Sequence, residues 1–167
     1  MVMKLGSLIT ATLPLLALAA CGEESTPAED AADVAQVREI HDNPPPVPVD
    51  PERISYNDIE KNNLFGAGCG FAPANSLSVI ALAQPENGYL KLKGEIIHLS
   101  PDKGGAELPM SSWQNYAGEK FAFELKQLPG EGEESGVEST SWPGALTITN
   151  AKDQTVYQAE GTLQCGA

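Results

Sequence analysis

Few side chains in this sequence have the type and spacing that acid–base or nucleophilic catalysis requires. The chain holds two histidines, His41 and His98. A serine triad in the C-terminal part would need His98 as its base, but Ser100 is too close along the same expected strand to face it, and no Gly-x-Ser-x-Gly motif is present. We therefore expect His98 to be an ordinary strand residue, and a hydrolytic enzyme is the least favoured function.

Paired carboxylates, which can serve as general acids and bases when buried, gather in one Gly-rich segment, Glu131-Gly132-Glu133-Glu134. Nothing in that polar segment indicates burial, so we expect a solvated loop rather than carboxyl groups with raised pKa values. Its spacing also differs from that of an EF-hand loop, which leaves Ca²⁺ binding as a secondary interpretation. The chain has no Cys-x-x-Cys spacing and His98 stands alone, so the sequence predicts no metal site and no cofactor.

Cys21 ends a short hydrophobic run at the start of the chain. Lys4 supplies a positive charge, residues 5–17 are apolar, and small residues precede the cysteine, as a secretory cleavage site requires. Leu18-Ala19-Ala20-Cys21 resembles the lipobox of bacterial lipoproteins. The resemblance implies cleavage before Cys21, diacylglycerol on its thiol and further acylation of the new amino terminus, and two or three chains make a stable membrane anchor.

Two other interpretations of this run are an ordinary signal peptide with a cysteine nearby by chance, and a transmembrane helix. The run is shorter than the roughly 20 apolar residues that a span needs and contains Pro14, which disfavours the helix. We therefore expect residues 1–20 to be a lipoprotein signal peptide. Gly22, rather than Asp, follows the cysteine and is similar to the outer-membrane sorting pattern, so we expect an anchor in the outer membrane of the bacterial envelope.

Assigning Cys21 to lipid leaves Cys69 and Cys165 as one pair in an oxidising compartment, which predicts a disulfide. On the chain-entropy model, closing a loop of about 96 residues stabilises a fold by roughly 4–5 kcal/mol. The odd number of cysteines and the lipobox therefore support each other.

The charge of the chain is strongly acidic, with 10 Lys and Arg against 23 Asp and Glu. Residues 21–50 hold eight acids and one base, and residues 51–167 hold fifteen acids and eight bases, so each part has a net charge of −7. Such a chain is repelled by nucleic acid and by anionic lipid headgroups. The charge permits a cationic partner, although solubility alone is sufficient to account for it.

Residues 21–52 are predicted to be a disordered tether. The segment after Cys21 is small and acidic and has too little apolar surface to offset chain entropy. Val34, Val37 and Ile40 allow at most a transient helical turn. Residues 44–51 include five prolines and indicate an extended polyproline II spacer, although such stretches can also bind aromatic grooves.

Residues 53–167 are predicted to form one mainly β domain, a small antiparallel sandwich or barrel with one short N-terminal helix and one disulfide. Ser55 is the expected N-cap of a helix over residues 55–63, and Asn63 or Gly66 can end it. Gly66 to Gly70 is expected to form a turn. Alternating or continuous apolar patterns predict strands over 77–83, 89–93, 95–99, 120–126, 145–149 and 155–165.

Turn signals separate these strands. Asn87-Gly88 is a hairpin signal, residues 129–141 form a long polar loop, and Gly161 is expected to mark a bulge in the last strand. Trp113, Tyr116 and Trp142 lie near Pro and Gly in expected loops, where they are either exposed binding anchors or lids on the barrel ends. The disulfide is expected to join the first strand to the last.

Two further resemblances concern the domain. Asp58-Ile59-Glu60-Lys61, residues 64–71, 88–92 and 161–166 resemble uncharacterised small lipoproteins of alpha-proteobacteria, which implies no activity. The cysteine positions, the acidic charge and Ser135-Gly136-Val137-Glu138-Ser139 also resemble the membrane-bound inhibitors of c-type lysozyme, lipoproteins with a small barrel and a Ser-Gly-x-x-Tyr loop. Here Ser139 replaces that tyrosine.

These observations predict a lipid-anchored envelope protein whose β-domain is not an enzyme. Its partner is an unidentified envelope protein or small molecule, and nucleic acid is excluded by charge. Candidate partner-binding residues are Ser135, Gly136, Trp113 and Trp142. Inhibition of c-type lysozyme is the alternative function, and hydrolysis is the second alternative.

Overall fold

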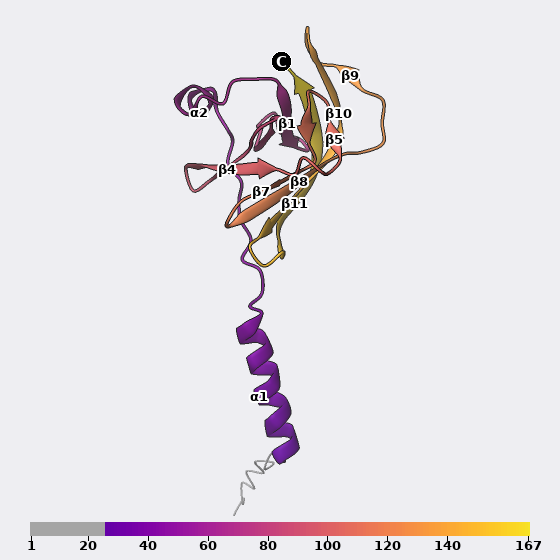
Figure 1. Cartoon of the computed structure of the whole chain (residues 1–167). Coiled ribbons are helices and arrows are strands. Elements are labelled where there is room, and N and C mark those ends of the chain that lie inside the picture. The colour runs from indigo at the N-terminus through magenta and orange to yellow at the C-terminus, as the bar shows by residue number, and fades with distance from the viewer. Residues whose placement is uncertain (1–25) are drawn as a thin grey trace, which may run out of the picture. The chain divides into compact units, whose positions relative to one another are not determined.

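The computed structural model describes residues 26–167, which fall into two compact units, one ending at Pro44 and one spanning Pro45–Ala167 (Figure 1). The first contains helix α1 (Pro27–Asp42), and the second contains helix α2 (Tyr56–Asn62) and all the strands. None of the helices within residues 26–167 has the length and apolar character to span a membrane.

The second unit is a closed antiparallel barrel. Its eight strands are β1 (Gly68–Pro73), β2 (Ala81–Ala83), β3 (Gly88–Leu92), β4 (Glu95–Pro101), β7 (Asn115–Ala117), β8 (Phe121–Gln127), β10 (Ser139–Asn150) and β11 (Thr155–Gly166). They pair in the order β11-β1-β2-β3-β4-β7-β8-β10, and β10 pairs with β11 to close the ring. Of the short strands, β5 (Glu107–Leu108) pairs with β6 (Ser112–Trp113), and β9 (Glu133–Glu134) adds to β10. Of the two predicted architectures, sandwich and barrel, the domain is therefore a barrel.

The disulfide joins the first strand to the last, as expected. Cys69 and Cys165 are direct register partners on β1 and β11, and both are 1 % exposed. They belong to a continuous core with Phe71, Leu125 and Leu163. Since apolar burial is the main force that stabilises a fold, this interior and its crosslink hold the barrel in one register.

Helix α2 begins and ends where the sequence indicates. The Ser55 hydroxyl accepts from the Asp58 backbone N–H, and the Asp58 carboxylate accepts from the Ser55 backbone N–H, which completes a capping box. Asn63 ends the helix in the left-handed conformation at φ 52°. Lys91 on β3 donates to both Asp58 carboxylate oxygens at 2.9 Å and ties the helix to the barrel.

Helix α1 corrects the expectation of disorder for residues 27–42, which are part of the predicted tether. Thr26 and Glu29 form a second capping box, Pro27 occupies the first turn, and four alanines follow. The helix buries no residue, so its formation rests on capping and propensity rather than on packing. The composition of this segment predicted disorder because composition reflects how much apolar surface a segment can bury. It does not reflect capping boxes or helix propensity.

The expectations for one strand, one turn and one loop also need correction. Of the predicted strand over 77–83, only Ala81–Ala83 is a strand. Leu77 is fully exposed, and the Val79 carbonyl accepts a hydrogen bond from the Ile54 N–H instead of from a neighbouring strand. Gly68 to Gly70 belong to β1 rather than to a turn. The polar loop over 129–141 contains β9 and the start of β10, and β5 to β7 had no sequence signal.

The expected bulge at Gly161 is wrong. Gly161 pairs in register with both Pro73 and Gly144, and the irregularity lies instead between Ile148 and Thr149. A Cβ at position 161 would overlap the backbone of Ala72 and Pro73. The glycine therefore permits a close approach of β11 to β1.

Candidate binding rim of the barrel

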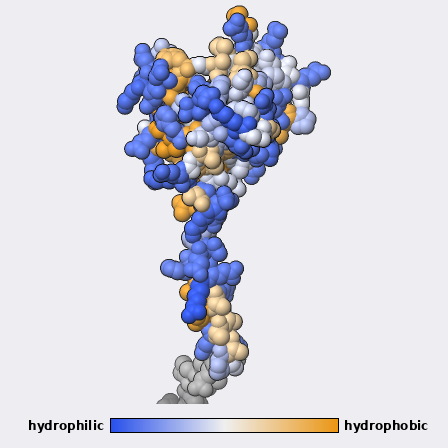
Figure 2. Space-filling view, viewed as in Figure 1, coloured by the Kyte–Doolittle hydropathy of each residue, from blue (hydrophilic) through white to orange (hydrophobic). Residues whose placement is uncertain are grey.

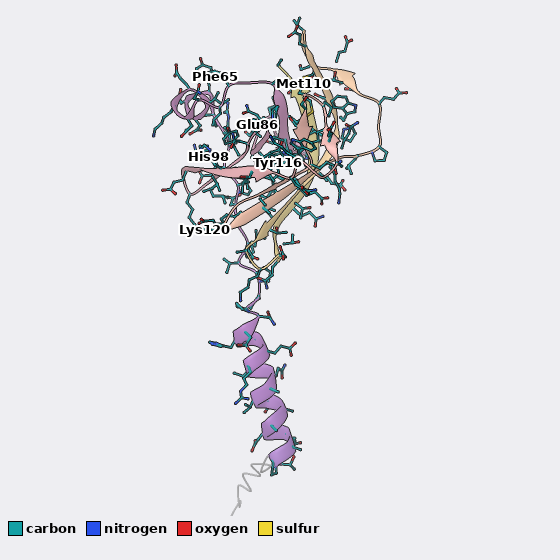
Figure 3. The ribbon with its side chains drawn as sticks, in the orientation of Figure 1. Phe65, Glu86, His98, Met110, Tyr116 and Lys120 are labelled. Carbon is teal, nitrogen blue, oxygen red and sulfur yellow. A yellow bond between two sulfur atoms is a disulfide. The ribbon has the colours of Figure 1, made fainter. Side chains whose placement is uncertain are left out.

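One end of the barrel, which we call the rim, contains most of the candidate binding residues. Gly166 lies opposite both Gly68 and Ser139 in the strand registers, so the ends of β1, β11 and β10 are neighbours there. The rim comprises these ends and the loops at residues 63–67, 109–111 and 130–138. The loop at 109–111 reaches it because the Pro109 carbonyl oxygen lies 3.5 Å from the Cys69 sulfur. Figure 3 labels Phe65 and Met110 at this end and Lys120 away from it.

The opposite end is where the chain enters the barrel. The Val49 N–H donates to the Val156 carbonyl at 3.0 Å, and Val156 follows the turn that joins β10 to β11. The β10–β11 register runs from Ser139 at the rim to Thr149 near that turn, a separation of roughly 30 Å at about 3.3 Å per residue. The rim and this entry end therefore lie at opposite ends of the longest hairpin.

A groove of about 300 Å³ opens at the rim. Its lining includes Ile59, Leu64, Phe65, Leu82 and Ala167, with the disulfide residue Cys69. Phe65 is 56 % exposed and meets the Tyr56 ring edge-on at 6.3 Å. Gln84 fixes the loop beneath it by donating from Nε2 to the Leu64 carbonyl at 2.8 Å. An aromatic ring is thus held at the mouth of a largely apolar groove.

The Ser135-Gly136 loop lies at the same rim and is exposed. The Ser135 N–H donates to the Ser139 carbonyl at 2.9 Å, and Gln164 donates from Nε2 to the hydroxyls of Ser135 and Ser139 at 3.1 and 3.2 Å. A Cβ at Gly136 would lie 2.7 Å from the Ser139 hydroxyl. The loop therefore has a defined conformation maintained by polar contacts to β11.

Acidic residues dominate this loop and its approach. Glu131, Glu133, Glu134 and Glu138 are all exposed, and no Lys or Arg occurs between residues 127 and 151. At the entry end, by contrast, the exposed acids Glu119 and Asp153 each adjoin a lysine in sequence. Figure 2 shows apolar patches interspersed with hydrophilic surface at the end that carries β9 in Figure 1.

The aromatic residues proposed as anchors or lids are mostly inside. Tyr116 is 1 % exposed, stacks on Phe123 at 4.9 Å, and donates from its hydroxyl to the Gln84 carbonyl at 2.7 Å. Burial raises the pKa of the Tyr116 hydroxyl. Trp113 and Trp142 are half-buried and pack against the core, and the Trp142 ring lies close against Gly132. The tryptophans thus support the rim loops and offer only part of their surface.

Of the acid–base candidates, the carboxylates of residues 131–134 lie on the exposed rim loop, whereas His98 lies on β4. His98 is exposed on β4, where its ring meets Tyr89 edge-on at 5.1 Å, in agreement with an ordinary strand residue. Within residues 26–167, no group of three or more His, Cys, Asp or Glu side chains is placed to hold a metal ion. Cys21 and the lipobox lie outside the described residues.

A second groove, of about 540 Å³, follows the outer face of β7, β8 and β10. Polar side chains of Asp102, Asn115, Glu124 and Thr147 line it. Glu124 is already paired with Lys126 at 2.8 Å. This groove therefore offers carboxylate, hydroxyl and amide groups but no exposed aromatic ring.

Comparison of the chain with family models, with curated proteins and with solved structures gives no match. Function must therefore be argued from the sequence and from the rim itself.

Proposed function

We propose that this chain is a lipid-anchored protein of the bacterial envelope whose barrel is a non-catalytic binding module that presents its rim to a partner. The observation that carries the proposal is the contact of Val49 with Val156 at the end opposite the rim. The segment that leads back to Cys21 leaves the barrel there. A barrel tethered at Cys21 is then joined to its tether at the end opposite the rim, and the rim is the end offered to a partner.

The side chains of the rim favour binding over catalysis. They are apolar, as at Phe65, or carboxylates on an exposed loop, as at Glu133 and Glu134. Carboxylates on an exposed loop serve charge recognition better than proton transfer, which favours buried groups. The lipobox at residues 18–21 supports the anchor, and Gly22 supports its location in the outer membrane.

Fatty-acid labelling tests the anchor. Cells that produce the Cys21→Ser variant should incorporate no labelled fatty acid into the protein, because only the thiol accepts diacylglycerol. Cys69→Ser is the matched control, since it also removes one thiol but should keep the label. Undiminished label on the Cys21→Ser variant would refute the lipoprotein assignment.

Inhibition of c-type lysozyme is the second candidate function. It is favoured by the position of Ser135 and Gly136 on the exposed rim of a barrel whose disulfide joins its first and last strands. The departure from that family is Ser139, whose hydroxyl lies 3.2 Å from the Ser135 hydroxyl within the loop. An aromatic ring would add buried contact area at this place, so any inhibition should be weaker than in the family.

A lysis assay decides between the two candidates. The chain from residue 22 onward is titrated into a c-type lysozyme while cell-wall lysis is followed. A binding module directed at another partner leaves the lysis rate unchanged. Dose-dependent inhibition that is lost in Ser135→Ala, but kept in the entry-end variant Thr155→Ala, would establish the inhibitor instead.

A further inference from the structure

We propose that the rim recognises a cationic polypeptide that inserts an apolar side chain into the groove at Phe65. The inference rests on the proposed binding function and adds the chemical class of the partner. It combines the apolar groove, the exposed apolar side chains of the rim and the sign of the charge on the rim loop.

The groove has the character of an anchor site. Three large apolar side chains of the rim are exposed: Phe65 by 56 %, Met110 by 41 % and Val137 by 102 % of their reference surface. Ala167 lines the groove, and its neighbour Gly166 lies against the Glu138 carbonyl and Ser139, so the acidic loop ends at the same strand end as the groove. Exposed apolar groups next to a preformed pocket commonly mark protein contacts.

The negative charge of the rim loop determines which class of partner fits the groove. The four glutamates of residues 131–138 have no basic residue beside them in the loop, so they attract Lys and Arg. A second copy of this chain would bring the same four carboxylates together across a symmetric interface, which like-charge repulsion opposes. Anionic lipid and nucleic acid are repelled for the same reason. A basic polypeptide is the occupant that satisfies both the groove and its surroundings.

The surface is also organised before binding. Gln164 holds the hydroxyls of Ser135 and Ser139, and Gln84 holds the Leu64 carbonyl under the groove. Little further ordering of these loops is then required when a partner binds, which lowers the entropic cost of association.

The test is selection of binders from a phage library of random linear peptides against the chain from residue 22 onward. Enriched peptides should combine Lys or Arg with an aromatic or aliphatic residue. Synthetic versions should bind more weakly as salt rises from about 0.05 to about 0.5 M, because screening shortens the reach of the charges. Enrichment of acidic or uncharged peptides, or of none, would overturn the inference.

Matched variants locate the site. Phe65→Ser should weaken a selected peptide at least about tenfold, and Glu133→Gln with Glu134→Gln should reduce both its affinity and its salt dependence. The controls remove the same kinds of group elsewhere: Leu77→Ser, which is fully exposed on the loop after β1, and Glu119→Gln with Asp153→Asn at the entry end. Equal loss in both sets would contradict the inference, and circular dichroism establishes that each variant is folded. Binding of acidic peptides at the rim would refute the partner class and leave the proposed binding function standing.

Discussion

Cys69 and Cys165 face each other in register across β1 and β11, with Cα atoms 4.0 Å apart and a sequence separation of 96. The disulfide therefore crosslinks two neighbouring strands directly below the rim. It also borders the groove, because Cys69 is one of the lining residues. The same bond thus stabilises the barrel and holds the floor of the candidate site.

Removal of this bond should destabilise the barrel. Cys69→Ala with Cys165→Ala should lower the free energy of unfolding by about 4 kcal/mol, because the unfolded chain regains the entropy of a long loop. Urea unfolding followed by tryptophan fluorescence measures the change, and reduction of the unaltered protein should reproduce it. Mass spectrometry that finds two free thiols in protein isolated without reductant would contradict the assignment.

Gly161→Ala should be destabilising by about 1–3 kcal/mol, because the added methyl group meets the backbone of Ala72 and Pro73 in a strand pair that cannot separate locally. Gly104→Ala is the control, since a Cβ there has no neighbour nearer than 3.5 Å. Thermal unfolding of both variants measures the difference. Equal melting temperatures for the two would show that β11 does not approach β1 this closely.

Asp58 should make the barrel sensitive to acid. Hydrogen bonds from the Ser55 hydroxyl, and then from Lys91, hold the pKa of the Asp58 carboxyl below its ordinary value. A carboxyl whose pKa is lower in the folded state contributes stability above its unfolded pKa, about 3.9, and that contribution disappears as pH falls further. Asp58→Asn should therefore melt lower than the unaltered protein at neutral pH, with the gap narrowing below about pH 4.

The matched control for this pH dependence is Asp153→Asn, which removes an exposed acid from the turn between β10 and β11. Its melting temperature should follow that of the unaltered protein throughout. A gap for Asp58→Asn that stays constant down to about pH 2 would show that the carboxylate contributes no pH-dependent stability.

Removal of its N-cap should destabilise helix α1 without changing the stability of the barrel. Thr26→Ala removes the side chain that accepts from the Glu29 N–H, a loss of about 1 kcal/mol for a helix. Because α1 buries no residue, packing cannot compensate. Backbone chemical shifts over residues 27–42 should move toward coil values, while the urea midpoint of the barrel stays the same. Unchanged shifts would contradict the local origin of this helix.

Features with a local signal were predictable from the sequence. Ser55 followed by Asp58 predicts the N-terminus of α2. The alternation of Phe121, Phe123 and Leu125 predicts β8. The pairing of Cys69 with Cys165 followed from the count of cysteines once Cys21 was assigned to lipid. In each case a few neighbouring residues, or simple arithmetic, contain the information.

Features set by distant contacts were not predictable. Gly161 allows close contact with Ala72, which lies far from it in the sequence. The sequence around Gly161 therefore favoured a bulge, and that interpretation is wrong. The groove was missed for the same reason, because Phe65 and Leu82 come from separate segments that meet only in the folded barrel. The exposure of Phe65 had no sequence signal either, because an apolar residue after a short helix is expected to pack against the domain.

On the proposed function, the rim, and not the entry end, engages a partner. This claim is tested most directly by in-cell photo-crosslinking with a benzophenone amino acid at Val137 on the rim and, as the matched position, at Lys120 on the β7–β8 turn. We predict an adduct of one discrete mass from position 137, lost when Phe65→Ser is added, and none from position 120. Equal adducts from both positions, or an adduct from position 120 alone, would contradict the account.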